Sequence, residues 1–185
     1  NRHSPLKADI DFRYKDKIAK RRYTFEHIKN TVLTYYKVFN NWLITPLEDE
    51  QCLCFVFEKK RVQFKNKEEH IVKDGLHLIW PYVVCPFVFQ YKVLEEVTKL
   101  SEENKIFDDI KSLEPYNKIF DAGIIECTWL MYGSCKPKNE SYKLTYILKY
   151  DTNTGTVKKI EIDKPFLIDE DKIKNWESKI KEEIA

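Results

Sequence analysis

Strict alternation of apolar and polar residues toward the C-terminal end constrains the fold of this chain more than any other feature. Over residues 143–150 every second residue is apolar or aromatic, namely Leu144, Tyr146, Leu148 and Tyr150. A short turn at residues 151–155 leads into a second strand-like segment, residues 156–162. Two such segments joined by a turn predict a β-hairpin, so at least part of the chain forms an antiparallel sheet.

Other segments predict helices that pack against strands. Behind Thr24, which caps a predicted helix, apolar residues recur at helical spacing: Phe25, Ile28, Val32, Tyr35, Tyr36 and Phe39. Further helices are predicted from Pro86 to about residue 100, near residues 104–111 and from Asp169 to the C-terminus. Further strands are predicted over residues 5–12, 52–57, 76–80 and 123–132. Since these elements follow no regular βαβ rhythm, we expect an α+β fold with helices packed around a mainly antiparallel sheet.

Composition excludes several classes of function. The length of 185 residues favours one domain, and only 4 glycines leave no room for a glycine-rich cofactor loop. The net charge of +2 is too small to indicate a nucleic-acid partner. The longest apolar run, residues 80–89, is far too short to span a membrane. The five cysteines lack zinc-finger spacing, and we expect them to be small buried residues in a reducing, intracellular compartment.

Asp9 and Asp11 stand two residues apart in the segment Ala8-Asp-Ile-Asp-Phe12. On a strand, residues i and i+2 point to one side with about 6.5–7 Å between their Cα atoms, so the two carboxylates are placed to hold divalent cations together. Oxygen ligands of this kind suit Mg²⁺ or Mn²⁺ rather than Zn²⁺. The alternative is an ordinary solvated acidic pair, because the same spacing recurs at the start of the last predicted helix, in Asp169-Glu170-Asp171.

His77 and Asp121 are two further candidates, and each has an ordinary alternative. His77 follows Gly75 in an apolar segment, where a histidine is either a hydrogen-bonded core residue or a donor to a phosphate oxygen or leaving group. Asp121 precedes Ala122-Gly123 and is either a simple turn or cap residue or part of a functional site. The residues alone leave both questions open.

A strand is predicted to end in the segment Gly133-Ser134-Cys135-Lys136-Pro137. Such an ending presents backbone N–H groups, a hydroxyl and an ammonium group together, which suits an anionic ligand. A surface turn with a single lysine is the alternative.

Taken in order, these segments resemble the archaeo-eukaryotic primase (AEP) domain, in particular the branch found in the primase–helicases of nucleocytoplasmic large DNA viruses such as poxviruses and asfarviruses. The similarity runs from about residue 5 to residue 150. Its most specific parts are Gly75-Leu-His-Leu-Ile-Trp-Pro81 and Trp129-Leu-Met-Tyr-Gly-Ser-x-Lys-Pro137. Other matching segments are residues 8–13, 22–28, 54–59 and 142–145.

The resemblance implies a two-metal nucleotidyltransferase with an RRM-like catalytic sheet and bound Mg²⁺ or Mn²⁺. The catalytic residues and metal ligands that it implies are Asp9, Asp11 and Asp121. The nucleotide-binding residues that it implies are His77, Ser134, Lys136, Arg13 and Lys73. The implied function is primer synthesis on a single-stranded DNA template from nucleoside triphosphates.

The resemblance also implies how the chain is organised. Residues 1–165 are expected to form the primase catalytic domain, and residues 166–185 a charged helix that connects to a downstream helicase region. Through that region, the subunits are expected to form a homo-oligomer. The expected location is the host cell cytoplasm, where such viruses replicate.

Two other classes of function fit the sequence. A non-catalytic module would bind single-stranded nucleic acid through lysines and exposed tyrosines, as in Tyr35-Tyr36-Lys37 and Tyr142-Lys143. A structural domain would serve mainly to assemble a helicase hexamer. A metal-dependent nuclease is chemically close to a primase, and a requirement for nucleoside triphosphate distinguishes the two. The enzyme requires Asp9, Asp11 and Asp121 to converge, whereas the binding module does not.

Overall fold

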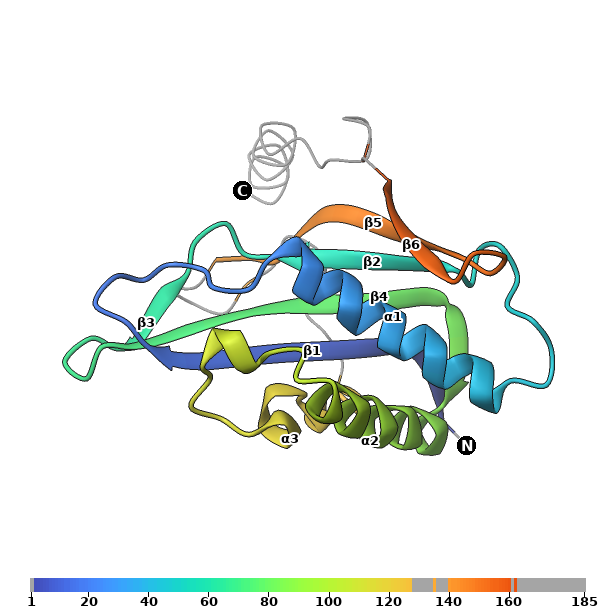
Figure 1. Cartoon of the computed structure of the whole chain (residues 1–185), viewed down its shortest axis with the longest axis horizontal. Helices are drawn as coiled ribbons and strands as arrows, with labels where there is room; N and C mark the ends of the chain where they lie inside the picture. The colour runs from blue at the N-terminus through green and yellow to red at the C-terminus, as the bar shows by residue number, and fades with distance from the viewer. Residues whose placement is uncertain (1, 128–134, 136–139, 161, 163–185) are drawn as a thin grey trace, which may run out of the picture.

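The computed structural model describes residues 2–127, 135, 140–160 and 162, and it is built on a six-stranded sheet (Figure 1). The strand order is β1-β4-β2-β5-β6, β3 pairs with β4, and all of these pairings are antiparallel. The strands are β1 (His3–Lys15), β2 (Leu53–Glu58), β3 (Gln63–Asn66), β4 (Ile71–Pro86), β5 (Lys143–Asp151) and β6 (Thr156–Ile160). The expected α+β class with a mainly antiparallel sheet is confirmed.

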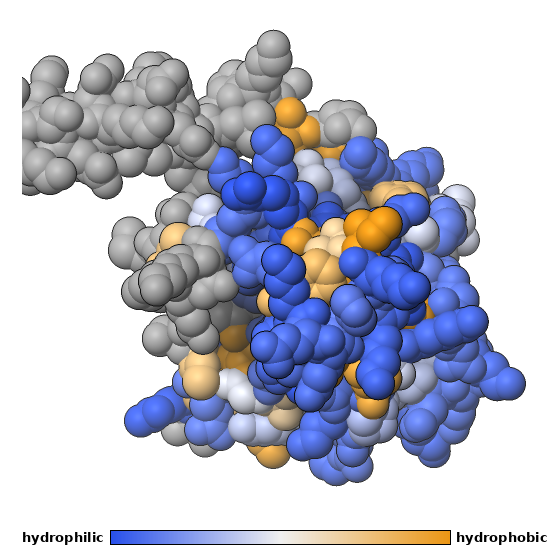
Figure 2. All heavy atoms as spheres, turned by 90° about the vertical axis from the view of Figure 1, so that its left-hand side faces the viewer, coloured by the Kyte–Doolittle hydropathy of each residue, from blue (hydrophilic) through white to orange (hydrophobic). Residues whose placement is uncertain are grey.

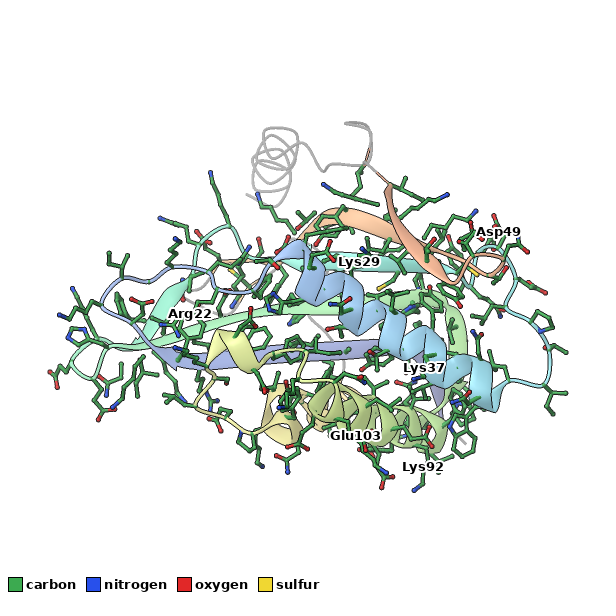
Figure 3. All side chains as sticks on the ribbon, in the orientation of Figure 1. Arg22, Lys29, Lys37, Asp49, Lys92 and Glu103 are labelled. Atoms are coloured by element: carbon green, nitrogen blue, oxygen red, sulfur yellow. The ribbon has the colours of Figure 1, made fainter. Side chains whose placement is uncertain are left out.

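Two long helices, α1 (Phe25–Trp42) and α2 (Phe87–Glu103), cross the same face of this sheet (Figure 1). Three short helical segments follow α2, namely η1 (Asp108–Ile110), α3 (Tyr116–Ile119) and η2 (Ala122–Ile124). The long helices are amphipathic, and their outer sides carry exposed charged residues, including Lys37, Lys92 and Glu103 (Figure 3). Their inner sides therefore bury apolar surface against the sheet, as the helical spacing predicts.

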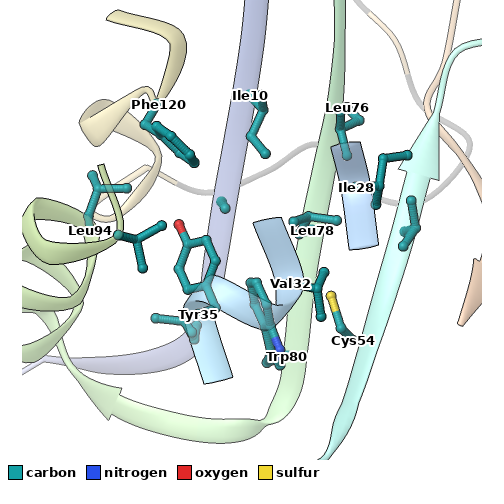
Figure 4. Packing of buried hydrophobic residues seen from close by; sticks show 14 of the residues in the cluster. Ile10, Ile28, Val32, Tyr35, Cys54, Leu76, Leu78, Trp80, Leu94 and Phe120 are labelled. Carbon is teal, nitrogen blue, oxygen red and sulfur yellow. The ribbon is translucent and has the colours of Figure 1, made fainter. Parts of the chain in front are cut away.

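The hydrophobic core fills the space between the helices and the sheet (Figure 4). On β1 every second residue is almost fully buried: Leu6, Ala8, Ile10, Phe12 and Tyr14. Trp80 of β4 packs against Tyr35 of α1, with ring centroids 4.6 Å apart. Each fully buried aromatic or aliphatic side chain contributes about 1.5–3 kcal/mol to folding, so this layer fixes which face of each strand is turned inward.

The predicted elements are largely confirmed, with differences where the sequence has no clear period. Structure and prediction agree on β1, β2, β4, β5, β6, α1 and α2, although β1 and β4 are longer than expected. The predicted helix at residues 104–111 is limited to the short turn η1. The strand predicted over residues 123–132 is wrong for its described part, because the Asp121 carboxylate accepts a hydrogen bond from Gly123 N at 2.9 Å and caps η2. The predicted helix from Asp169 lies outside the described residues.

The cysteines follow the prediction only in part. Cys52, Cys54 and Cys85 are buried, as expected of small apolar residues. Cys127 and Cys135 are exposed, so the expectation is wrong for these two.

The surface of the described residues is largely polar at the end of the molecule that carries β3 (Figure 2). Hydrophilic side chains cover most of that end, with a small hydrophobic group near its centre. None of the described helices is both long enough and apolar enough to cross a membrane.

Replacing His27 with alanine is expected to lower the free energy of unfolding by about 1–2 kcal/mol. His27 Nδ1 accepts a hydrogen bond from Thr24 N at 2.9 Å and so caps α1, while Nε2 lies 2.8 Å from Asp109 Oδ1 and ties the helix to η1. His27→Gln should lose less stability, because glutamine at this position also caps the preceding backbone N–H group. Urea denaturation measures both variants, and equal stability of His27→Ala and the unmodified protein would contradict this role.

Candidate active site

Asp9 and Asp11 project from the face of the sheet opposite to the helices. Their neighbours Ala8, Ile10 and Phe12 are buried beneath α1 and α2, and successive side chains of a strand point to opposite faces. The two carboxylates therefore lie on the other side, which we call the carboxylate face. The expectation that they share one side of a strand is confirmed.

Asp121 reaches Asp9 along the outer edge of β1. Phe120 forms an isolated antiparallel bridge with Ile10, and Asp121 N donates a hydrogen bond to Asp9 O at 3.0 Å. Phe120 is buried like Ile10, so the next residue, Asp121, is turned toward the carboxylate face beside Asp9. Asp121 is thus both the cap of η2 and a neighbour of the acidic pair, and its role in a functional site stays a prediction.

His77 approaches Asp9 from the opposite side. In the antiparallel register of β1 and β4, His77 pairs with Asp9, and its Nε2 lies 3.4 Å from Asp9 Oδ1. Directly opposed residues of an antiparallel pair have Cβ atoms about 4.5–5.5 Å apart, close enough for their side chains to interact. Asp121, Asp9 and His77 therefore form a row across three adjacent chain segments.

The Asp9 carboxyl group is held in a setting that disfavours its charge. Burial is the largest cause, and with the carboxylates of Asp11 and Asp121 it raises the pKa of Asp9 to about 7, although Lys73 and Lys59 act in the opposite direction. Among the described residues, Asp9 Oδ1 is buried without a hydrogen-bond partner. A buried carboxylate oxygen without a hydrogen bond destabilises the folded state. Its presence here therefore indicates a functional role rather than a structural one.

The contact between His77 and Asp9 is not a salt bridge. Burial, followed by the nearby ammonium groups of Lys59 and Lys73, lowers the pKa of His77 to about 3. The imidazole is therefore uncharged at neutral pH and can offer one N–H donor to a ligand.

Lys73 and Gly75 surround the second carboxylate, Asp11. The Lys73 ammonium lies 2.6 Å from Asp11 Oδ2, so Lys73 is on the carboxylate face, and its implied role in nucleotide binding stays a prediction. Gly75 pairs with Asp11 across the two strands. A Cβ atom at Gly75 would lie 2.9 Å from Asp11 Oδ1 and 2.4 Å from the Ile10 carbonyl oxygen, so the absence of a side chain keeps space open beside Asp11.

Lys59 and Tyr142 also lie at the site, although the sequence assigns neither residue to a catalytic site and predicts Tyr142 only as an exposed tyrosine of the alternative binding module. The Tyr142 ring stacks on the His77 imidazole, with ring centroids 3.6 Å apart, and the Lys59 ammonium lies 4.6 Å from the centroid of the Tyr142 ring. Both residues fall in the segments that carry the family resemblance. Neither the spacing nor the residue type predicts that the two side chains meet at His77, because they come together only through strand register.

A partly buried ionic cluster supports the site from the helix side of the sheet. Arg21 contacts Glu58 at 3.1 Å and Asp74 at 3.3 Å, and it donates a hydrogen bond to the Lys59 carbonyl oxygen at 2.7 Å. Tyr23 donates to Glu58 at 2.9 Å. Because Asp74 and Glu58 belong to β4 and β2, the cluster fixes the chain segments that present Lys73 and Lys59.

Of the remaining predicted nucleotide-binding residues, the structure describes Arg13 but not Ser134 or Lys136. Arg13 lies on the same side of β1 as Asp11 and forms an ion pair with Glu114. Together with Lys65 it lines a hollow of about 430 Å³. Ser134 and Lys136 lie outside the described residues, so their relation to the carboxylates stays a prediction.

The donor set fits a divalent cation in its chemistry. Asp9, Asp11 and Asp121 offer the carboxylate oxygens that Mg²⁺ and Mn²⁺ prefer. Asp9 Oδ1, which has no hydrogen-bond partner in the described part of the chain, and the space beside Gly75 are both compatible with such an ion. Within the described ranges, no group of three or more His, Cys, Asp and Glu side chains forms a metal-binding cluster as it stands. Asp11 is turned toward Lys73, and Asp121 accepts a hydrogen bond from Gly123.

Comparison with known proteins gives two matches. Residues 1–148 match the family model described as the C962R protein N-terminal AEP domain. The chain is also 35% identical over 138 residues to the Acanthamoeba polyphaga mimivirus protein named "Putative helicase L207/L206". That alignment covers 74% of this chain and 14% of the mimivirus protein, so the chain spans only a small part of the relative's length. The range that the family model covers, residues 1–148, contains the three carboxylates and His77.

Proposed function

The chain belongs to the AEP domain family, and from this premise we propose that its carboxylate face transfers nucleotides during primer synthesis on single-stranded DNA. The observation that carries the proposal is the convergence of Asp9, Asp11 and Asp121 beside His77 on one face of the sheet. These carboxylates come from two chain segments 110 residues apart, and their mutual repulsion is unfavourable unless they bind a cation. Nucleotidyl transfer uses such an arrangement, and a passive nucleic-acid-binding surface does not require it.

In this proposal the chain's own residues position and neutralise the reacting groups. Asp9 and Asp11, with Asp121, would hold Mg²⁺ or Mn²⁺, which would lower the pKa of the attacking 3′-hydroxyl and offset the charge of the leaving pyrophosphate. The uncharged His77 would donate a hydrogen bond to a phosphate oxygen. Lys73, now paired with Asp11, would turn to the phosphates as a compact positive charge.

The alternative of a non-catalytic binding module has less support. Its predicted stacking residues Tyr35 and Tyr36 have exposed fractions of 1% and 0%, so the prediction that they are exposed is wrong. They lie on the core side of α1, where Tyr36 stacks on Tyr150 with ring centroids 4.3 Å apart. Tyr142 is not a free platform either, because its ring packs against His77.

The mimivirus relative is named as a helicase and is about seven times longer than its aligned region. We propose that this chain likewise works as part of a larger primase–helicase. The connection through residues 166–185 and the formation of a homo-oligomer stay predictions within that proposal.

The protein is expected to incorporate labelled nucleoside triphosphates into products on a single-stranded DNA template only when Mg²⁺ or Mn²⁺ is present. Chelation of the cation by EDTA should reduce product to background, because the carboxylates alone cannot stabilise the developing phosphate charge. Denaturing gels measure the products, and thermal unfolding with Mn²⁺ plus nucleotide should show stabilisation, since ligands that bind only the folded state raise the melting temperature.

Two outcomes would contradict the proposal. Cleavage of the template without nucleoside triphosphate would indicate a nuclease. Binding of the template without incorporation, and without a metal-dependent thermal shift, would favour the non-catalytic module.

A further inference from the structure

We propose that Lys59 binds a phosphate group of the ligand at the carboxylate face, and that Tyr142 is the positioning residue that holds Lys59 beside His77. This inference rests on the proposed function and adds to it a cation and an aromatic ring to which the family resemblance gives no role. The ligand chemistry is a phosphate, carried either by a nucleoside triphosphate or by the backbone of the DNA strand.

The main chain at Lys59 is fixed at the end of β2. Phe57, two residues earlier, pairs with His77 on β4 and with Leu144 on β5, so this end of β2 lies next to the site. The Arg21 guanidinium donates to the Lys59 carbonyl oxygen at 2.7 Å and also contacts Glu58. The starting point of the Lys59 side chain is therefore held firmly, and its ammonium group can be directed by a single further contact.

Tyr142 supplies that further contact. The Lys59 ammonium lies 4.6 Å from the centroid of the Tyr142 ring, within the range of a cation–π interaction. The same ring stacks on the His77 imidazole, whose Nε2 is 3.4 Å from Asp9. The Tyr142 ring thus contacts both the Lys59 ammonium and the His77 imidazole, and the imidazole in turn lies beside the Asp9 carboxylate.

The charges around Lys59 favour an anion with more than one negative oxygen. Lys59 is half-buried, and its pKa is lowered by burial first and then by the neighbouring ammonium of Lys73, while Asp11, Asp9 and Glu140 act in the opposite direction. Two ammonium groups beside one acidic cluster repel each other. If the carboxylates held a cation, Asp9 and Asp11 would no longer offset the charge of the two lysines, and a phosphate group could contact both.

The test measures binding rather than turnover. With Mn²⁺ present, the dissociation constant of a fluorescent nucleoside triphosphate is measured by anisotropy, and a labelled single-stranded oligonucleotide is measured in parallel. Lys59→Ala is expected to weaken binding of at least one probe about tenfold, and the exposed neighbour Lys60→Ala, which removes the same charge one residue further on, should change neither.

The role of Tyr142 is tested by comparing a variant that keeps the aromatic ring with one that removes it. Tyr142→Phe keeps the ring and should bind like the unmodified protein, whereas Tyr142→Leu should weaken binding about as much as Lys59→Ala. Tyr146→Leu is the matched control, because Tyr146 makes a similar cation–π contact with Lys159, 4.8 Å from its ring centroid, on the helix side of the sheet. This control should lower the melting temperature without weakening ligand binding.

The outcomes distinguish the role of Lys59 and Tyr142 from the proposed function itself. A loss with the triphosphate alone assigns the phosphate to the nucleotide, and a loss with the oligonucleotide alone assigns it to the strand. If the unmodified protein binds and Lys59→Ala binds equally well, the role of Lys59 is overturned and the proposed function stands. An equal loss in Tyr142→Phe and Tyr142→Leu overturns the role of the ring. If the unmodified protein binds neither probe, the proposed function fails, and this inference fails with it.

Discussion

Asp9→Asn is expected to abolish nucleotide incorporation while leaving the protein folded and, at neutral pH, more stable. Asp9 is the central residue of the row that joins Asp121 to His77, so in the proposed function its carboxylate would help to hold the cation. A metal ligand at a phosphoryl-transfer centre contributes several kcal/mol of transition-state stabilisation, which corresponds to a loss of at least about a thousandfold in rate. The gel assay of incorporation measures this loss directly.

The stability change has a definite sign and pH range. The pKa of Asp9 is about 7 in the folded protein, against 3.8 for the ordinary side chain. The folded state therefore holds its proton more tightly, and stability is lost as the pH rises from about 4 to about 7. Asparagine carries no charge, so the variant avoids the cost of burying the Asp9 carboxylate. Its free energy of unfolding should exceed that of the unmodified protein by on the order of 4 kcal/mol at pH 8, and should be unchanged near pH 4.

The control for this prediction is Asp49→Asn. The Asp49 side chain is 83% exposed and pairs with Lys149 at the surface, so its neutralisation should change neither incorporation nor stability by much. Near-normal incorporation by Asp9→Asn would contradict the assignment of the site. A large drop in melting temperature at pH 8 would contradict the electrostatic account, because it would show that the Asp9 charge stabilises the fold.

The sequence predicts the parts of this structure that depend on a local period. Alternation placed β1, β5 and β6 correctly, and it placed Asp9 and Asp11 on one face because side chains of residues i and i+2 share a side. Helical spacing identified α1 and placed Tyr35 and Tyr36 in its apolar stripe, and only the alternative of a binding module required these two tyrosines to be exposed. The four-residue strand β3 and the short helix α3 were missed, since neither is long enough to show a period.

The site depends on long-range pairing, which local pattern does not encode. Asp121 is brought to Asp9 by a single bridge between Phe120 and Ile10 at the edge of the sheet. No spacing rule relates residues 9 and 121, and only the family resemblance joined them. Lys59 and Tyr142 meet His77 through the register of three strands, and the resemblance assigned no role to either residue. The local pattern therefore predicts which residue types could carry chemistry, but it does not predict that they lie close together in the fold.

Gly75→Ala is expected to damage both the fold and the site, with a loss of about 3 kcal/mol in the free energy of unfolding. The added Cβ atom would lie 2.4 Å from the Ile10 carbonyl oxygen, which is backbone and cannot turn aside. β1 would have to move away from β4 where Asp11 pairs with Gly75, so the hydrogen bonds of the two strands and the spacing of the carboxylates would change together. Incorporation should fall at least about tenfold even where the variant remains folded, because displacements of this size disturb the alignment of reacting groups.

Gly155→Ala separates this effect from the general cost of replacing a glycine. Gly155 lies in the turn between β5 and β6 with φ of 65°, and nothing within 4 Å would meet its Cβ atom. Only backbone strain opposes alanine there, so the loss should be about 1 kcal/mol, with normal incorporation. Urea denaturation and the incorporation assay on both variants decide the matter. If Gly75→Ala is no worse than Gly155→Ala in both measurements, close packing of β1 on β4 is not what holds Asp9 and Asp11 in place, and the origin of the site geometry must lie in the segment that carries Asp121.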